Sequence, residues 1–319
     1  MNTHIAGIAV ANIAQSPIES LAVEPGQREL VRFLKLDGFQ NYAHTADDIA
    51  TLAADPLRKC ISDIGIRPED IDAILFCTEC LWNNDLIQHS TDGKDTFESI
   101  RDSLLNATLV ELGMCNAHPY VSAFSACSNL VTTLRVARNL IETKEHNNVL
   151  VVIAERQMPG TQRIPSNAAY VFSDMALAFL VSDQHRGYQL SHLVSHTSAA
   201  MFRTKHSGDT LQQGKELLVA LSTFDEKVRH RTGRPLRDHG IVVCDNVSSM
   251  MASLVCRGLS IADRELLMPT KADYGHAFSM DGFLSLRKLR LEGKLGAGDV
   301  VSLLSVGPWA LGLIVVVLP

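Results

Sequence analysis

Residues 121–140 read Val121-Ser-Ala-Phe-Ser-Ala-Cys127-Ser-Asn-Leu-Val-Thr-Thr-Leu-Arg-Val-Ala-Arg-Asn-Leu140. A short apolar run here meets Cys127 between small residues, and the pattern predicts that an amphipathic helix begins at once. A thiol at a helix start lies at the positive end of the helix dipole, near backbone N–H groups that favour the thiolate. Cys127 therefore fits a catalytic nucleophile, although a small buried residue is the common alternative.

The composition indicates an ordinary globular protein. The length of 319 residues predicts two packed units or one internally duplicated domain, and 46% of the residues are hydrophobic. A net charge of −6, without a dense Lys/Arg run, argues against nucleic acid as the main ligand. We see no signal peptide and no apolar run of about 18 residues, so we expect a cytoplasmic protein that does not span a membrane.

Seven cysteines are scattered through apolar segments, at positions 60, 77, 80, 115, 127, 244 and 256. An odd, dispersed set fits free thiols in a reducing compartment better than a disulfide framework. The spacing Cys77-Thr-Glu-Cys80 has no second pair and no histidine run near it. A lone pair cannot complete a tetrahedral site, and we expect no bound metal.

Strand and helix patterns alternate along the chain, which predicts an α/β fold with helices over a sheet. The expected strands are 5–14, 71–77, 119–126, 148–154, 171–182, 189–195, 240–244, 299–305 and 311–318. The expected helices are 46–64 with Thr45 as N-cap, 96–112, the one after Cys127, 211–231, 248–257 and 278–292. Polar residues 83–95 and 201–210 are expected to be surface loops.

Five blocks resemble, in the right order, the type III β-ketoacyl-acyl carrier protein synthases of the thiolase superfamily. They are Ala46–Thr78, the nucleophile segment Ser122–Ser128, Phe172-Ser-Asp-Met-Ala-Leu-Ala-Phe-Leu180, Ala272-Asp-Tyr-Gly-His276 and Ser305-Val-Gly-Pro-Trp-Ala-Leu-Gly312. The resemblance implies a five-layered αβαβα thiolase fold with two similar halves, which we place at residues 1–182 and 183–319. It also implies a homodimer in which Cys127 is acylated by an acyl thioester.

Two family segments depart from their usual pattern. The family's Pro-His-Gln-Ala-Asn segment corresponds to Ile241-Val-Val-Cys-Asp-Asn-Val-Ser248, where Cys244 or Asp245 replaces the histidine, depending on the alignment. In the second segment, His276 replaces the family's asparagine. An ionised Asp245 accepts hydrogen bonds only and would repel an enolate, but beside His276 it would orient the imidazole. We therefore predict the catalytic set Cys127, His276 and Asp245.

Other interpretations of these residues are structural. Asp245 directly precedes a predicted helix and could be its N-cap, and His276 could be a buried structural histidine. His239 could supply the missing imidazole if the backbone shifts locally.

An oxyanion hole is expected from the backbone N–H groups of Cys127 and Gly307. The family has consecutive glycines in this turn, whereas Pro308 here has no N–H to donate. Ser173, Met175 and Leu177 replace three further family glycines, so we expect a narrower substrate space or a repacked core.

The acyl donor is expected to be a coenzyme A or acyl carrier protein thioester, which is a substrate, so no cofactor is predicted. Residues 29–45 lack the tryptophan and the Arg-Thr-Gly-Ile run of the family's coenzyme A entrance, which makes a carrier protein at least as good a candidate. Basic residues that could meet an acidic carrier are Arg203, Lys205, Arg229 and Arg231.

Acyl transfer to a small hydroxyl, amine, thiol or carbon acceptor, in polyketide- or fatty-acid-type secondary metabolism, is the leading hypothesis. The alternatives are a decarboxylative condensing enzyme and a non-catalytic partner subunit. The donor chain length and the acceptor stay open at this point.

Overall fold

The computed structural model describes residues 3–22, 25–79, 96–123, 125–157, 160–205, 207, 209–262 and 266–319. Cys80 and the predicted loop at 83–95 lie outside these ranges. Ten strands of the described residues form one sheet. They are β1 (His4–Val10), β4 (Ala73–Cys77), β5 (His118–Ser122), β6 (Asn148–Glu155), β7 (Met175–Ser182), β8 (Tyr188–Thr197), β9 (Ile241–Cys244), β10 (Leu266–Leu267), β11 (Val300–Val306) and β12 (Ala310–Val317).

The strand order repeats itself. One half of the sheet runs β5-β4-β6-β7-β1, and the other runs β10-β9-β11-β12-β8. In each half the first three strands are parallel, and the last two add antiparallel. The halves join through an antiparallel pairing of β1 with β8, at His4–Gln189 and Ile5–Tyr188. The same topology therefore occurs twice. Residue 182 ends β7, which is the last strand of the first set along the chain.

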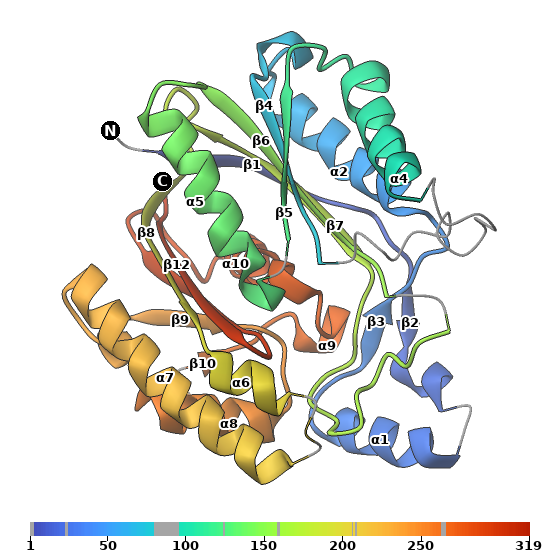
Figure 1. Cartoon of the computed structure of the whole chain (residues 1–319), viewed down its shortest axis with the longest axis vertical. Helices are drawn as coiled ribbons and strands as arrows, with labels where there is room; N and C mark the ends of the chain where they lie inside the picture. The colour runs from blue at the N-terminus through green and yellow to red at the C-terminus, as the bar shows by residue number, and fades with distance from the viewer. Residues whose placement is uncertain are drawn as a thin grey trace.

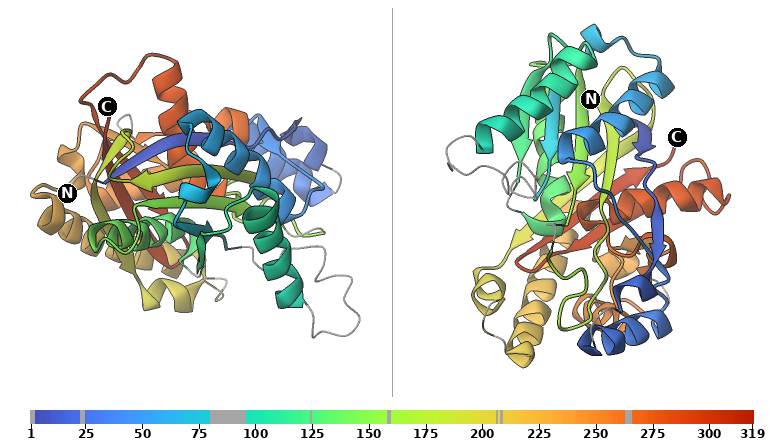
Figure 2. Two further views of the ribbon diagram at one scale, coloured as in Figure 1. Left: turned by 90° about the horizontal axis from the view of Figure 1, so that it is seen from above. Right: turned by 90° about the vertical axis from the view of Figure 1, so that its right-hand side faces the viewer.

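Helices divide the molecule into layers (Figure 1). Helix α2 (Ile49–Ile64) packs on β1, β6 and β7 from outside, whereas α7 (Thr210–Thr232) packs on β8 and β12 and also contacts α8 (Ser249–Leu259). Between the halves lie α5 (Asn129–Glu142) and α10 (Asp281–Leu291), which contact strands of both. In the right-hand view of Figure 2, α2 lies at the opposite end of the molecule from α7 and α8. The αβαβα arrangement predicted for the thiolase fold is confirmed.

Three apolar cores separate these layers. The central core joins residues of α5 and α10 to strands of both halves, one outer core lies under α2, and the other lies under α7 and α8. Helix α5 buries Leu130, Val131, Leu134, Ala137 and Ile141 along one face, as expected for an amphipathic helix. This face packs in the central core, against strands of both halves.

The sequence analysis placed most of the long elements but missed one helix and several short elements. The segment at residues 29–45, taken only as a substrate entrance, overlaps α1 (Pro25–Leu36) and contains β3 (Asn41–Ala43), which pairs with β2 (Gln15–Pro17). The predicted loop at 201–210 overlaps α6 (Ala199–Thr204). The helix expected at 96–112 is α4 (Thr96–Leu105) followed by a π-helical segment, Asn106–Glu111. A short helix, α9 (Lys271–Tyr274), precedes His276.

The N-cap of α2 was also predicted wrongly. Asp48 caps the helix, because its carboxylate accepts a hydrogen bond from the Thr51 N–H at 2.7 Å. Thr45 lies one turn earlier and accepts from the Asp47 N–H. An aspartate in extended conformation directly before the helix is the better cap, since it combines the hydrogen bond with a charge that favours the helix dipole.

Replacing Leu134 by Ala should destabilise the whole fold, because this fully buried side chain lies in the layer shared by both halves. We expect the free energy of unfolding to fall by about 2–5 kcal/mol in a urea titration. Leu291→Ala in α10 is the matched control, since Leu291 is 72% exposed. A loss below about 0.5 kcal/mol is expected there, and equal losses would contradict the central role of α5.

Candidate active site

Cys127 lies in a tight turn between β5 and α5. Residues Ala126–Ser128 form a single 3-10 turn, and Ala126 has a φ of +49°, a strained value for a residue with a side chain. The turn packs directly on the loop after β11: a Cβ on Gly307 would lie 2.8 Å from the Ala126 Cβ and 3.2 Å from the Cys127 backbone nitrogen. Only glycine permits this approach, which fixes the nucleophile turn in place.

His276 faces this thiol from the other half of the chain. Its Nε2 lies 3.3 Å from the Cys127 Sγ. Its backbone N–H donates to the Val171 carbonyl at 2.8 Å, and its own carbonyl accepts from the Ser173 N–H at 2.9 Å. The rings of Tyr170, Phe172 and Phe278 lie 4.7–5.8 Å from the imidazole. Backbone bonds and aromatic packing thus set the orientation of His276.

Asp281 is the carboxylate that binds His276, and the sequence analysis missed it. Its Oδ2 lies 2.6 Å from His276 Nδ1, and it also accepts hydrogen bonds from the backbone N–H groups of Asn246 and Ala277 and from the Asn246 side chain. An ionised carboxylate only accepts, so His276 carries its proton on Nδ1 and leaves Nε2 free for the thiol. The available signal was an Asp in the first turn of the predicted 278–292 helix, five residues after His276.

In the first departing segment, Cys244 and Asp245 occupy different environments. Cys244 is buried in the outer core under α7 and α8, whereas Asp245 interacts electrostatically with His276 and Cys127. Asp245 does not hydrogen-bond the imidazole, however: its Oδ2 accepts from the Val306 N–H at 2.8 Å. The N-cap of α8 is Ser248, so the cap alternative for Asp245 is wrong. In this geometry Asp245 holds the turn beside Cys127, and Asp281 occupies the position that we had assigned to it.

Two other predicted groups are engaged elsewhere. His239 lies between Ser302 Oγ at 2.6 Å and Thr232 Oγ1 at 3.3 Å, so it is not brought to the thiol. The Gly307 N–H donates to the Ala310 carbonyl at 2.9 Å, within the β11–β12 turn. An oxyanion could use this N–H only if that bond were exchanged. What Gly307 provides in this structure is space for the Cys127 backbone.

Burial and negative charge together suppress the thiolate that the helix start had suggested. Burial raises the pKa of the Cys127 thiol well above its usual value, and Asp245, Glu79 and Asp281 raise it further. For His276, burial lowers the pKa, but the contacts with Asp281 outweigh it and the net pKa is above 6.5. These effects oppose the helix-start effect that the sequence suggested. His276 Nε2, at 3.3 Å from the Cys127 Sγ, is placed to accept the thiol proton.

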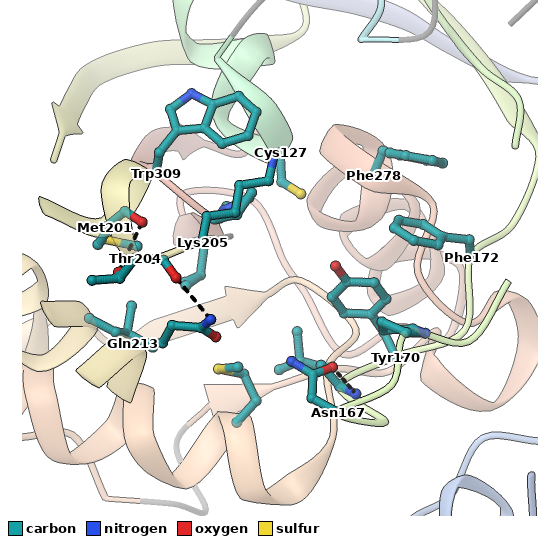
Figure 3. Close-up of a pocket in the computed structure, with 18 of the residues that line it drawn as sticks. Cys127, Asn167, Tyr170, Phe172, Met201, Thr204, Lys205, Gln213, Phe278 and Trp309 are labelled. Carbon is teal, nitrogen blue, oxygen red and sulfur yellow. Dashed lines mark hydrogen bonds between the residues drawn. The ribbon is translucent and has the colours of Figure 1, made fainter. Parts of the chain in front are cut away.

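A pocket of about 460 Å³ leads to Cys127 (Figure 3). Its lining is mostly apolar, with polar groups from Glu79, Asn167, Thr204, Lys205 and Gln213. A pocket of this size and character suits a small organic ligand. Ser173, Met175 and Leu177, which replace family glycines, are absent from the pocket lining. Met175 and Leu177 pack in the central core instead, so these replacements change the packing of that core and do not narrow the pocket.

Of the basic residues considered for a carrier protein, Lys205 lines the pocket, with its Nζ 4.2 Å from the centroid of the Trp309 ring. Arg231 lines a separate cavity of about 630 Å³ together with Arg135, Arg138 and Lys227. Within the residues that the structure describes, no cluster of three or more His, Cys, Asp or Glu could hold a metal ion. The described helices include none that is long and apolar enough to cross a bilayer.

A family model, 3-oxoacyl-[acyl-carrier-protein] synthase III, matches residues 123–199, which include Cys127. The β-ketoacyl-[acyl-carrier-protein] synthase III of Staphylococcus haemolyticus is 24% identical over 56% of this chain and 53% of its own length. The Staphylococcus aureus protein of the same name is 25% identical over 46% and 42%. The matched part thus spans about half the length of these curated relatives.

Solved structures match over nearly the whole chain. ChlB3, an acyltransferase, has a TM-score of 0.76 at 16% identity, covering 100% of this chain and 98% of its own. Synthase III from Aquifex aeolicus has 0.70 at 15% identity, covering 99% of both. These matches show that the chain has the fold of the thiolase-type synthases. Xanthomonas campestris OleA also matches, with a TM-score of 0.75 at 15% identity over 99% of this chain and 97% of its own. In sequence, the matched part of the chain is similar to the type III synthases.

Exchanging each aspartate for asparagine should show which one supports His276. With Asp281→Asn, we expect alkylation of Cys127 by iodoacetamide to slow at least about tenfold, since the imidazolium loses its partner. Asp281 raises the pKa of His276, so reactivity of the wild type is lost as the pH falls through a pKa above 6.5. This acid limb should move to lower pH in Asp281→Asn.

Asp245→Asn should change the rate less than about threefold, because removing its charge eases thiolate formation while weakening the imidazolium. The amide oxygen that this substitution introduces can still accept a hydrogen bond from the Val306 N–H. Alkylation rates from pH 5 to 9 by intact-mass spectrometry, with circular dichroism as a check on folding, make the comparison. A larger loss in Asp245→Asn than in Asp281→Asn would restore Asp245 as the triad member.

Proposed function

We propose that the protein is an acyltransferase that carries the acyl group on Cys127. The observation that supports this most strongly is the chain Asp281–His276–Cys127, with contacts of 2.6 and 3.3 Å, at the base of a largely apolar pocket. A nucleophile, a base in the correct tautomer and an orienting carboxylate are the parts that covalent acyl transfer requires.

The reaction proceeds in two half-reactions. Cys127 gives its proton to His276 Nε2, and its sulfur attacks the donor thioester; the donor sulfur leaves and takes that proton. An acceptor X–H then gives its proton to His276 as the X–C bond forms. The bond from the acyl carbon to Cys127 breaks, and its sulfur regains the proton. His276 is thus the base and then the acid in each half-reaction.

Charge favours this transfer over decarboxylative condensation. Glu79, Asp245 and Asp281 all raise the pKa of His276 or Cys127 through their negative charge, so the site opposes an additional anion. A malonyl group brings a carboxylate, and its decarboxylation develops an enolate that needs hydrogen-bond donors. His276 is the one imidazole at this site among the described residues. The Cys127 N–H, at the base of the pocket, is our candidate donor for the tetrahedral oxyanion.

The donor class and the assembly are part of the same proposal. The synthase III relatives carry acyl carrier protein in their name, which supports a carrier or coenzyme A thioester as donor. Strand β5 lies at the edge of the sheet, and its Val121 is 58% exposed. An exposed edge strand can pair with a second copy, which supports a homodimer.

Incubation with hexanoyl-N-acetylcysteamine should add one hexanoyl group to the wild-type chain, because the pocket exposes Cys127 to small thioesters. Intact-mass spectrometry measures the adduct, and Cys127→Ala should show none. Cys115→Ala is the matched control, since Cys115 is exposed and lies outside the pocket lining. Its adduct should equal that of the wild type. Absence of a Cys127-dependent adduct with hexanoyl, acetyl and benzoyl donors would favour the non-catalytic subunit.

A further inference from the structure

Glu79 is a carboxyl group in the pocket that the acyl-transfer steps do not use. It follows β4 by two residues, and its backbone N–H donates to both carboxylate oxygens of Glu155, at 2.9 and 3.1 Å. Its backbone is therefore anchored, while its side chain lines the same pocket as Cys127. The Glu79 side chain thus extends into the pocket from an anchored backbone.

One oxygen of this side chain lacks a hydrogen-bond donor. Glu79 Oε1 is buried and has no hydrogen-bond partner among the residues that the structure describes. Among the described residues, no Lys, Arg or His forms an ion pair with the Glu79 carboxyl group. Lys205, which also lines the pocket, lies over the Trp309 ring. A buried carboxylate oxygen without a donor is costly, and few native groups are left in that state. A donor supplied by a ligand would satisfy it.

The charge of Glu79 acts on the reacting groups themselves. It contributes to raising the pKa of Cys127, of His276 and of the Tyr170 phenol. Burial raises the pKa of Glu79 itself to about 7, against the opposing pull of Lys205 and His276. Because the Glu79 side chain lines the same pocket as Cys127, a molecule bound in this pocket can contact both.

We propose that Glu79 recognises the acceptor by receiving a hydrogen bond from its amino or hydroxyl group. This inference rests on the proposed acyl transfer and names its acceptor class: a molecule with two donor hydrogens near the nucleophilic atom, as in a primary amine or a diol. One hydrogen goes to His276 as the X–C bond forms. The other stays in the hydrogen bond to Glu79, which exchanges no proton.

A purely structural role for Glu79 and the proposed binding role predict different effects of Glu79→Leu on the melting temperature. If the side chain held the fold together, Glu79→Leu would lower the melting temperature. A binding group without a partner destabilises the free protein instead, so the melting temperature of Glu79→Leu should equal or exceed that of the wild type.

The kinetic test starts from enzyme already loaded with hexanoyl on Cys127. Loss of the adduct is followed by intact mass after addition of 2-phenylethylamine, 1-phenylethane-1,2-diol or 2-phenylethanethiol, the last being a weak hydrogen-bond donor. We expect the amine and the diol to deacylate Glu79→Leu at least about tenfold more slowly than the wild type, the loss expected for one hydrogen bond to a charged group. The thiol should react alike with both.

Glu226→Gln is the matched control, because Glu226 is an exposed carboxyl on α7 outside the pocket lining. Its rates should stay within about twofold of the wild type. Equal amine and diol rates in the wild type and Glu79→Leu would overturn the inference, as would a melting temperature lowered by more than about 5 °C. The inference is also overturned if neither the amine nor the diol deacylates the loaded wild-type enzyme. Failure of the wild type to load would instead contradict the proposed function.

Discussion

The close contact between Gly307 and the backbone of Ala126 and Cys127 is the constraint on which the site depends. It joins the β11–β12 turn of one half of the sheet to the nucleophile turn of the other, with no room for a Cβ between them. Asp245 holds the neighbouring Val306 N–H, and the strained Ala126 bends the chain into the turn. Because the two halves of the sheet meet at this contact, a change in how the halves pack would also move the Cys127 backbone.

A small number of contacts also fixes His276 beside the Cys127 thiol. Backbone hydrogen bonds to Val171 and Ser173 fix its main chain, and Asp281 at the start of α10 fixes its tautomer. Burial raises the pKa of the Cys127 thiol most, and the surrounding carboxyl groups Asp245, Glu79 and Asp281 raise it further. A substrate that brings another negative charge is disfavoured beside these carboxyl groups. This is the physical reason for our preference for acyl transfer.

The sequence predicted the layered fold, because long amphipathic and buried segments carry strong periodicity and five blocks resembled one family. Cys127 and His276 were recognised for the same reason, since each lies in such a block. Asp281 was missed because nothing in a linear pattern separates a charge that begins a helix from one that binds a side chain five residues earlier. The role of Asp245 and the engaged Gly307 N–H depend on which backbone groups meet in space. Periodicity does not report that.

The most direct measurement is carbon dioxide release from malonyl-N-acetylcysteamine labelled with ¹³C in its free carboxyl group, added to enzyme already acylated on Cys127. If the protein transfers acyl groups without decarboxylation, as we propose, release should not exceed that of Cys127→Ala while an amine or diol still removes the acyl group. Release of labelled carbon dioxide in step with formation of a β-ketoacyl product would contradict acyl transfer. It would establish a condensing enzyme instead.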